Sequence, residues 1–400
     1  MKQKILKYSN ICKKGTFSLT VLLVAGFSSC NDQVESNSES AIANSETNSP
    51  ESQIQAMEWP MVPGEDSPKL SVGISSNATV EEMRRAKQIG ADYVLMGGPP
   101  IPWTEEGLRE IMDRFEAEEL TVINMMIGGY DDAIFGREGR DQQIEDVKAS
   151  LRAAGAVGLP VVEYNWYADR FMKGYHEVIG RGGAGMTGFD YNYQGAKDLP
   201  LNPERGEAQT AEMLWNNITY FLEAVIPVAE EAGVRMALHP NDPPVPVSKG
   251  HAQIMRTFDD WKRLLDIVDS PSNGMTYHNG VSIEAGADPL EVMRYMGERD
   301  RLNHWHYRNV ISEVPFEKYT EVFPDEGQID MLAIMEGMYE QGYNRGVYPE
   351  HPRALTYDKE HPDGIRNGYP GGGGYAGLTY NVAYTKAMMQ AVMTLRERNK

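Results

Sequence analysis

The sequence predicts a single-domain (β/α)8 barrel, a TIM barrel, with a long loop after its fourth strand. Eight short runs rich in apolar or β-branched residues each precede a stretch with helical spacing. These units repeat over about 330 residues, a length typical of one such barrel with insertions. The rival fold is a doubly wound open sheet, but no glycine-rich phosphate turn follows the first strand. The regular repeat therefore favours the closed barrel.

The expected elements follow one another in strict alternation. The strands are expected at 70–75, 93–97, 121–127, 161–166, 235–239, 275–278, 304–310 and 346–350. The helices are expected at 79–89, 104–118, 139–155, 206–232, 258–268, 289–297, 329–341 and 379–397. Thr104 and Thr257, each followed closely by acidic residues, are helix-start signals, because threonine caps a helix and acidic side chains favour its first turn.

The segment 167–205 is the main irregularity in this pattern. It follows the fourth strand and is rich in Gly, Tyr and Asp. Long loops at the carboxyl ends of barrel strands are usually functional rather than filler. We therefore expect this segment to cover the substrate as a lid.

The first sixty residues are expected to lie outside the barrel. Several lysines precede an apolar run at 17–27, and small residues then lead to Cys30, as in a bacterial lipoprotein signal. Residues 31–60 carry little that a core would bury and predict a flexible tether. The domains are thus a signal peptide (1–30), a tether (31–60) and a catalytic barrel (61–400). An uncleaved anchor is the alternative, and either reading takes the body out of the cytoplasm.

Composition limits the partners. The net charge of −20 repels nucleic acid and anionic lipid headgroups, so we expect no nucleic-acid partner. Contact with a membrane is expected only through a lipid on Cys30, at the periplasm or the cell surface. Because the only cysteines are Cys12 and Cys30, the body has neither disulfides nor thiolate chemistry. A homo-oligomer is compatible with the sequence.

Four successive strands end in residues that bind metals. His239, His278, His306 and Glu350 stand at the ends of the fifth to eighth expected strands. A lone histidine at a strand end is more often structural, but four candidates in register share one rim. Neutral imidazoles and a carboxylate suit a divalent cation. We therefore predict one divalent metal site, with His304 deeper in the barrel as a core residue or a support for the ligands.

Other polar residues share the predicted rim. Glu163 and Tyr164 end the fourth strand, and Arg308 beside Asn309 suits bidentate capture of a carboxylate. A salt bridge within the rim is an equal alternative for Arg308. The residues expected to bind substrate are Asn309, Asn241, Asp242, Asn279, Arg353 and Tyr369.

The motifs, in this order, resemble the mannonate dehydratase family of xylose-isomerase-like TIM barrels. The family's His-Pro-Asp-Asp-Pro-Pro motif corresponds to residues 239–244, its Gly-x-Thr-x-Cys-x-Gly segment to 274–280 and its His-x-Arg-Asn-Val motif to 306–310. An Asp-Glu-Gly-x-x-Asp stretch follows at 325–330, and the resemblance extends over about 206–400. Two positions depart from the family: His278 replaces a metal-binding cysteine, and Glu350 replaces a metal-binding aspartate.

The resemblance implies a metal-dependent dehydratase acting on a sugar acid. The proton α to a carboxylate is removed and the β-hydroxyl leaves, with His351 and Tyr164 as acid–base candidates, Glu163 as a further base and Arg308 as carboxylate anchor. Mn²⁺ is the expected metal, with Zn²⁺, Ni²⁺ or Fe²⁺ as alternatives. Export and the changed ligands favour a uronic acid at the non-reducing end of a polysaccharide-derived oligosaccharide. The alternatives are free D-mannonate, a sugar isomerase or epimerase, and a non-catalytic carbohydrate-binding lipoprotein.

Overall fold

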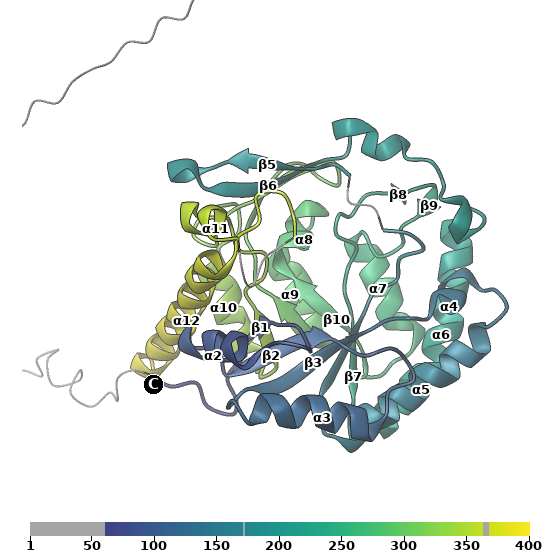
Figure 1. Cartoon of the computed structure of the whole chain (residues 1–400), viewed down its shortest axis with the longest axis horizontal. Helices are drawn as coiled ribbons and strands as arrows, with labels where there is room; N and C mark the ends of the chain where they lie inside the picture. Colours follow the sequence, from purple (N-terminus) through teal and green to yellow (C-terminus); the bar gives the residue numbers. More distant parts are fainter. Residues whose placement is uncertain (1–60, 171–172, 363–367) are drawn as a thin grey trace, which may run out of the picture. The chain divides into compact units, whose positions relative to one another are not determined.

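The computed structural model describes residues 61–170, 173–362 and 368–400. Eight parallel strands close into a barrel in the order β1-β14-β11-β10-β7-β4-β3-β2, which confirms the predicted (β/α)8 fold (Figure 1). The predicted signal peptide and tether lie outside the described residues, so they stay predictions, as does export. Among the described residues, no helix combines the length and apolarity needed to cross a membrane.

The barrel strands lie close to the expected ranges. They are β1 (Lys69–Gly73), β2 (Tyr93–Gly97), β3 (Thr121–Ile127), β4 (Val161–Tyr164), β7 (Arg235–Leu238), β10 (Asn273–His278), β11 (Leu302–His306) and β14 (Gly346–Tyr348). The seventh strand ends at His306 rather than at residue 310, because a new antiparallel strand begins at Val310. Residues 307–309 therefore form the connection between the barrel and the segment that follows it.

Helices surround the strands in the expected alternation. The long ones are α2 (Val80–Gln88), α3 (Glu105–Glu116), α5 (Arg140–Ala156), α6 (Ala211–Glu231), α7 (Phe258–Ile267), α9 (Pro289–Gly297), α10 (Met331–Glu340) and α12 (Tyr375–Arg398). Short helices are α4 (Asp131–Phe135), α8 (Asn279–Glu284) and α11 (Thr356–Glu360). Thr104 and Thr257 cap α3 and α7 through their side chains, as their sequence signals predicted.

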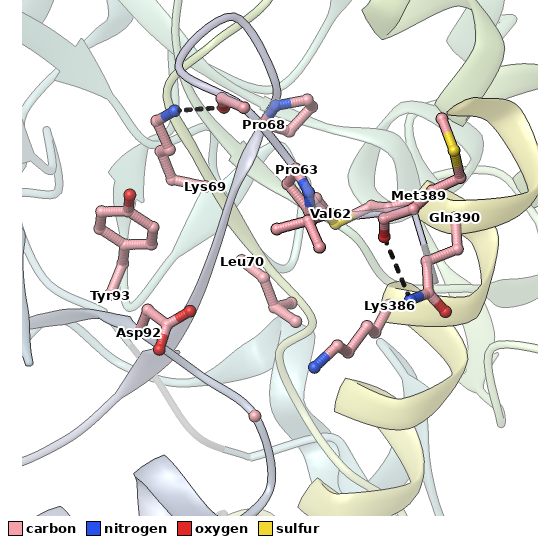
Figure 2. Close-up of a pocket in the computed structure, with 13 residues that line it drawn as sticks. Val62, Pro63, Pro68, Lys69, Leu70, Asp92, Tyr93, Lys386, Met389 and Gln390 are labelled. Carbon is pink, nitrogen blue, oxygen red and sulfur yellow. Dashed lines mark hydrogen bonds between the residues drawn. The ribbon is translucent and has the colours of Figure 1, made fainter. Parts of the chain in front are cut away.

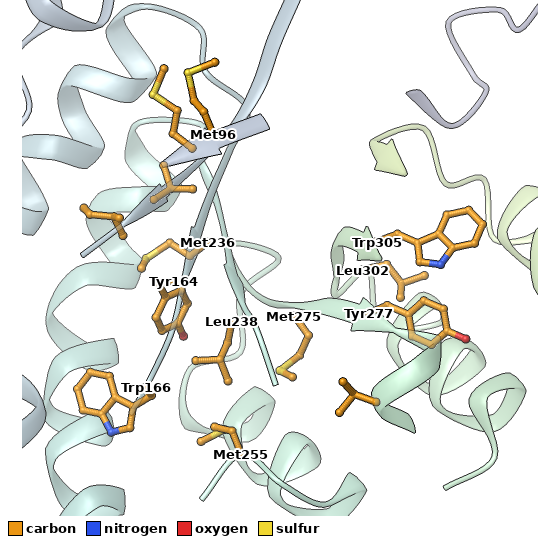
Figure 3. Packing of buried hydrophobic residues seen from close by; sticks show 14 of the residues in the cluster. Met96, Tyr164, Trp166, Met236, Leu238, Met255, Met275, Tyr277, Leu302 and Trp305 are labelled. Carbon is orange, nitrogen blue, oxygen red and sulfur yellow. The ribbon is translucent and has the colours of Figure 1, made fainter. Parts of the chain in front are cut away.

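Strand alternation separates the two faces of each barrel strand. On the outer face, apolar side chains pack under the helices, among them Tyr164, Met236, Tyr277 and Trp305 (Figure 3). Intervening positions such as Glu163, Thr276 and His304 point to the opposite side, into the barrel. The barrel interior is thus polar near its carboxyl end, although it is buried. Such a buried polar set has to be satisfied internally or by a ligand.

Two distant segments join in a second sheet, which we call the lid sheet. Its order is β12 (Val310–Val314), β13 (Lys318–Glu321), β6 (Gly185–Asp190) and β5 (Tyr175–Ile179). The expected lid after the fourth strand supplies β5 and β6, and the connection after β11 supplies β12 and β13. Central pairing aligns Glu321 with Thr187 and Lys318 with Asp190 in antiparallel register. A two-stranded sheet, β8 (Val247–Ser248) with β9 (His251–Ala252), follows β7.

Candidate metal centre

A cavity of about 180 Å³ opens at the carboxyl ends of the barrel strands. Its lining residues are Met126, Asn165, Tyr167, Arg170, His239, Asp242, His306, Glu350, His351 and Tyr369. This is the end at which TIM barrels carry their active sites. The four predicted metal residues meet here: one ligand atom from each of His239, His278, His306 and Glu350 lies within 4.8 Å of all the others. Metal binding by these four residues stays a prediction. The position and the hydrogen bonds of each side chain show how well it could serve as a ligand.

Hydrogen bonds hold His239 in an orientation and a tautomer suited to metal binding. It directly follows β7, and its backbone N–H donates to the Tyr164 carbonyl at 2.9 Å, which extends the strand pairing by one residue. Its Nδ1 lies 2.7 Å from the Pro240 carbonyl oxygen, to which only a protonated nitrogen can donate. The proton therefore sits on Nδ1, and Nε2 presents its lone pair to the cavity. A carbonyl that fixes the tautomer in this way is a usual feature of metal-binding histidines.

His306 and Glu350 complete the side of the site formed by β11 and β14. His306 is only 4% exposed, yet neither ring nitrogen has a hydrogen-bond partner among the described residues. Its Nδ1 lies 3.2 Å from Glu350 Oε2. Burial tends to raise the pKa of Glu350, but nearby His351, His278 and His306 lower it well below its usual range. An ionised carboxylate beside an unsatisfied buried imidazole is a donor set that suits a divalent cation.

His278 fits a metal less directly. Its Nδ1 accepts the backbone N–H of Val281 at 3.2 Å and thereby caps α8. A neutral ring that accepts at Nδ1 carries its proton on Nε2, which lies 2.7 Å from Glu350 Oε1. Burial lowers the pKa of His278 to about 3, so the ring is neutral. To bind a metal through Nε2, His278 has to give up its hydrogen bond to the helix. In this arrangement it positions Glu350.

Beneath these residues, Glu163 and His304 support the site from inside the barrel. Glu163 is 1% exposed and accepts hydrogen bonds from Thr276 Oγ1 (2.7 Å) and Asn124 Nδ2 (2.9 Å). It lies 3.6 Å from His306 Nε2 and does not line the cavity. The expectation that Glu163 removes a substrate proton is therefore corrected: it faces the back of His306. His304 is fully buried beside both residues, as expected for a supporting residue.

Arg308 is the centre of a buried charge network. Its Nε lies 2.9 Å from Glu350, its Nη1 2.8 Å from Glu284 and 3.2 Å from Glu321, and its Nη2 3.1 Å from Asp242. All three guanidinium nitrogens are thus engaged, and Arg308 is 2% exposed. The alternative of a salt bridge within the rim is the one that the structure supports. The expected role of carboxylate anchor is corrected, since Arg308 does not line the cavity and its guanidinium already contacts four protein carboxyl groups.

His351 faces the cavity and is oriented from behind. Its Nδ1 lies 3.1 Å from both carboxylate oxygens of Glu321, the last residue of β13. Burial favours the neutral acid, but Arg308, His351 and Arg353 lower the pKa of Glu321 overall, so it accepts the Nδ1 proton. His351 Nε2 is then directed toward Glu350 Oε2, at 3.4 Å. His351 also has a φ of 42°, a conformation that costs about 1–3 kcal/mol and that clusters at functional sites.

Several predicted site residues lie away from the cavity. Tyr164 points outward, where its ring packs near Phe221 of α6, because it alternates with the inward-facing Glu163 (Figure 3). Its assignment as an acid–base residue is wrong. The predicted substrate-binding residues that are instead buried in structural hydrogen bonds are Asn241, Asn279, Asn309 and Arg353. Asp242 and Tyr369 do line the cavity, as expected.

Several residues at the site were not singled out from the sequence, and three of them bear on its chemistry. Arg170 and Tyr167 line the cavity from the segment after β4, and Glu321 orients His351 from the lid sheet. Tyr167 Oη accepts a hydrogen bond from the backbone N–H of Asp242 at 2.8 Å. A basic and an aromatic residue at the start of a long loop are a signal that could have identified Arg170 and Tyr167. Glu321 gives no such signal, because β13 is placed by pairing with a strand over a hundred residues away.

A separate cavity of about 250 Å³ lies at the opposite, amino-terminal end of the barrel (Figure 2). It is lined by the start of β1, including Lys69 and Leu70, by Asp92 and Tyr93 before and within β2, and by Lys386 of α12. No histidine lines it, and among the described residues none of the candidate metal groups lies there. This end of a TIM barrel normally serves stability.

Comparisons with known proteins agree with the motif resemblance. The family model for D-mannonate dehydratase (UxuA) matches residues 202–399. A mannonate dehydratase of Streptococcus suis (strain 05ZYH33) is 29% identical over 313 residues, covering 72% of this chain and 85% of that protein. One from Lactococcus lactis subsp. cremoris (strain MG1363) is 28% identical over 324 residues, covering 72% and 90%.

Solved structures give the same picture. The crystal structure of mannonate dehydratase from Streptococcus suis serotype 2 matches with a TM-score of 0.70 at 27% identity, over 83% of this chain and 95% of that one. The structure of L-ribulose 3-epimerase matches with a TM-score of 0.51 at 14% identity, over 82% and 97%. The latter shows a shared fold alone.

His239 and His278 differ in how well their ring nitrogens are placed to bind a metal ion. Replacing each residue measures this difference. His278→Ala should weaken Mn²⁺ binding by about 10- to 100-fold, the range for residues that position ligands. His239→Ala should weaken it by more, because it removes a preset donor. Titration calorimetry with Mn²⁺ on both variants provides the comparison, with His361→Ala, on an exposed residue, as control. Equal losses at the two positions would contradict the assignment of tautomers.

Removal of the Arg308 charge should destabilise the fold. Arg308→Gln leaves buried carboxylates without their cation, a change that costs about 3–5 kcal/mol. Arg85→Gln, which breaks an exposed i,i+4 pair with Glu81, should cost no more than about 1 kcal/mol. Urea unfolding of both variants gives the two free energies. A similar small loss in both would show that the network around Arg308 contributes little to stability.

Proposed function

We propose, on the premise that the chain belongs to the mannonate dehydratase family, that its metal centre removes water from a sugar acid of the mannonate type. The enzyme class, a hydro-lyase, follows from the family. The observation that carries the proposal is the convergence of three imidazoles and one carboxylate beside His351 at the barrel mouth. Mn²⁺ is the proposed metal, and it would act as a Lewis acid on the substrate's carboxylate end.

His351 is the proposed base. Its Nδ1–H is held by Glu321, so Nε2 is the nitrogen that takes up a proton, and it faces the cavity. An anionic partner behind the ring stabilises the imidazolium that forms. The proton that His351 removes is the one α to the substrate's carboxylate, which is a weak acid. A base within hydrogen-bond reach contributes typically about 10²–10⁴-fold to such a step.

Tyr369 takes the place of Tyr164 as the proposed acid. Its ring lies 4.9 Å from that of His351, centroid to centroid, and it lines the same cavity. Burial raises the pKa of Tyr369 well above the usual value for a phenol, so the hydroxyl keeps its proton. Arg170 Nη2 donates to Tyr369 Oη and would stabilise the phenolate that forms when this proton passes to the departing β-hydroxyl, which leaves as water.

Arg170 is the proposed carboxylate anchor, in place of Arg308. It is the one arginine among the described residues that line the cavity, and the structure records no ion pair for it there. Its Nη2 donates to the Asp242 carbonyl (2.9 Å) and to Tyr369 Oη (2.5 Å), both neutral acceptors. A guanidinium that lines the cavity without a direct ion pair is suited to a carboxylate.

A uronic acid at the non-reducing end of an oligosaccharide is the second candidate substrate. The same elimination applies, because C5–H lies α to the carboxylate and the C4 hydroxyl lies β to it. The replacements at His278 and Glu350 and the proposed export, lipid-anchored through Cys30, support this candidate over a free cytoplasmic aldonate.

Dehydration and metal dependence can be tested together. Incubation with D-mannonate, and with a glucuronate-terminated disaccharide, should give a product lighter by one water in mass spectrometry. Chelation should abolish the reaction, and added Mn²⁺ should restore it, since the donor set serves that ion. Hydrogen exchange at a sugar carbon without loss of mass would show an isomerase or epimerase instead. Sugar binding without turnover, insensitive to chelation, would show a non-catalytic protein.

The anchoring role of Arg170 predicts a defect in substrate binding. Arg170→Gln should raise KM for the acid by about 10- to 100-fold, the equivalent of a charge-assisted hydrogen bond, with a smaller effect on kcat. Arg170→Lys should recover part of the loss. Arg181→Gln is the matched control, because Arg181 pairs with Asp325 outside the cavity. An unchanged KM in Arg170→Gln would assign the carboxylate to another group.

A further inference from the structure

A groove of about 390 Å³ continues from the metal cavity across the carboxyl ends of β2 and β3. Met126, Asn165 and Tyr167 line both spaces, so the two adjoin each other. The floor is formed by two pairs of glycines, Gly97-Gly98 at the end of β2 and Gly128-Gly129 after β3. We call this space the glycine groove. It is larger than the metal cavity itself, and the proposed chemistry does not use it.

Two of these glycines are not required by the fold. A Cβ at Gly97 or at Gly128 would meet no atom within 4 Å, and neither residue has a positive φ. Their neighbours differ: a Cβ at Gly98 would strike Trp103, and Gly129 has a φ of 89°. Glycine normally lowers stability relative to alanine, so a fold gains nothing from it at the first two positions. The absence of side chains at these two positions leaves open space beside the metal cavity.

The walls of the groove match a neutral sugar. Met126, Ile127 and Ile134 offer apolar surface, and Asn165 and Tyr167 stand at the junction with the cavity. Pockets of this mixture bind ligands by apolar packing, with a few polar groups for orientation. Of the described residues that line the groove, none is Lys or Arg, and the carboxylate of Asp131 is paired with Arg205. The groove therefore has no partner for a second acidic group.

The positions of the charged and uncharged residues determine which end of a bound substrate lies in the metal cavity. Arg170 and the metal residues hold the acid end in the cavity, while the uncharged groove takes the part that follows. An open-chain hexonate held by its carboxylate has no sugar ring that could occupy the groove. We propose that the glycine groove binds a neutral sugar ring glycosidically linked to the acid, so that the substrate is an acid-terminated oligosaccharide. This inference rests on the proposed dehydration of a sugar acid at the metal centre.

Filling the groove tests the inference. Gly128→Phe and Gly97→Phe add a ring at positions where the Cβ meets no atom within 4 Å, and Gly128→Ala adds one methyl group as a graded variant. Gly64→Phe is the matched control, because a Cβ there also meets nothing within 4 Å and the residue lines the cavity at the opposite end of the barrel. Thermal melts that match the control show that the variants are folded.

The readouts are binding and turnover. The binding probes are 4-deoxyglucuronate and its disaccharide, which lack the leaving hydroxyl and so bind without reacting. Calorimetry on the Mn²⁺-loaded wild type should give tighter binding of the disaccharide by about tenfold or more, the discrimination expected of one additional pocket contact. Both Phe variants should lose this preference, and Gly64→Phe should keep it. In turnover, the ratio of kcat/KM for the glucuronate-terminated disaccharide over D-mannonate should fall in parallel.

Each outcome has a distinct meaning. If the wild type binds both probes equally, or if the Phe variants retain the preference for the disaccharide, the groove is not a sugar subsite and the inference is overturned. If the preference is present and is lost on filling, while no acid loses water, the subsite stands and the dehydratase proposal fails. If D-mannonate alone reacts and the groove variants leave its kinetics and all binding untouched, the substrate is the free aldonate.

Discussion

The buried guanidinium of Arg308 is the interaction on which the rest of the site depends. Its partners come from four different places: Asp242 after β7, Glu284 in α8, Glu321 in β13 and Glu350 after β14. One cation therefore ties the barrel, a short helix and the lid sheet to a predicted metal ligand. Because a buried charge is stable only when it is paired, none of these elements can shift alone without a large penalty.

The same network leaves an excess of negative charge. Burial raises the pKa of Glu284 well above its usual value, so it carries a proton. Asp242, Glu163, Glu321 and Glu350 all have a pKa held below the ordinary range and are ionised, because nearby guanidinium and imidazole groups outweigh the effect of burial. Arg308 and Arg353 are the two guanidinium groups buried among them. Burial tends to lower the pKa of His306, but Glu350 and Glu163 raise it overall, so the ring attracts a proton. A divalent cation bound here would take the place of that proton and neutralise the remaining negative charge.

Much of this architecture could be predicted from the sequence. Hydrophobic periodicity placed the eight barrel strands, since each is a local pattern, and the rule that active sites sit at strand ends brought His239, His278, His306 and Glu350 together. The direction of a side chain was predictable only where a strand boundary was right. Tyr164 illustrates the limit: proximity in sequence to Glu163 suggested a shared site, whereas alternation sends the two to opposite faces. Arg308 shows another limit, because its four partners lie on separate elements that local patterns cannot pair.

The lid sheet has a consequence for how this protein can diversify. Its strands come from two βα connections, one after β4 and one after β11, that pair through β6 and β13. In many TIM barrels, each connection can be exchanged separately, which is how one scaffold acquires new activities. Here a changed loop after β4 would remove the pairing of β6 with β13, leave β13 held by β12 alone, and so disturb the position of Glu321, which orients His351. The two connections therefore depend on each other structurally. A change of substrate specificity in this barrel, in evolution or in the laboratory, requires that both be exchanged together.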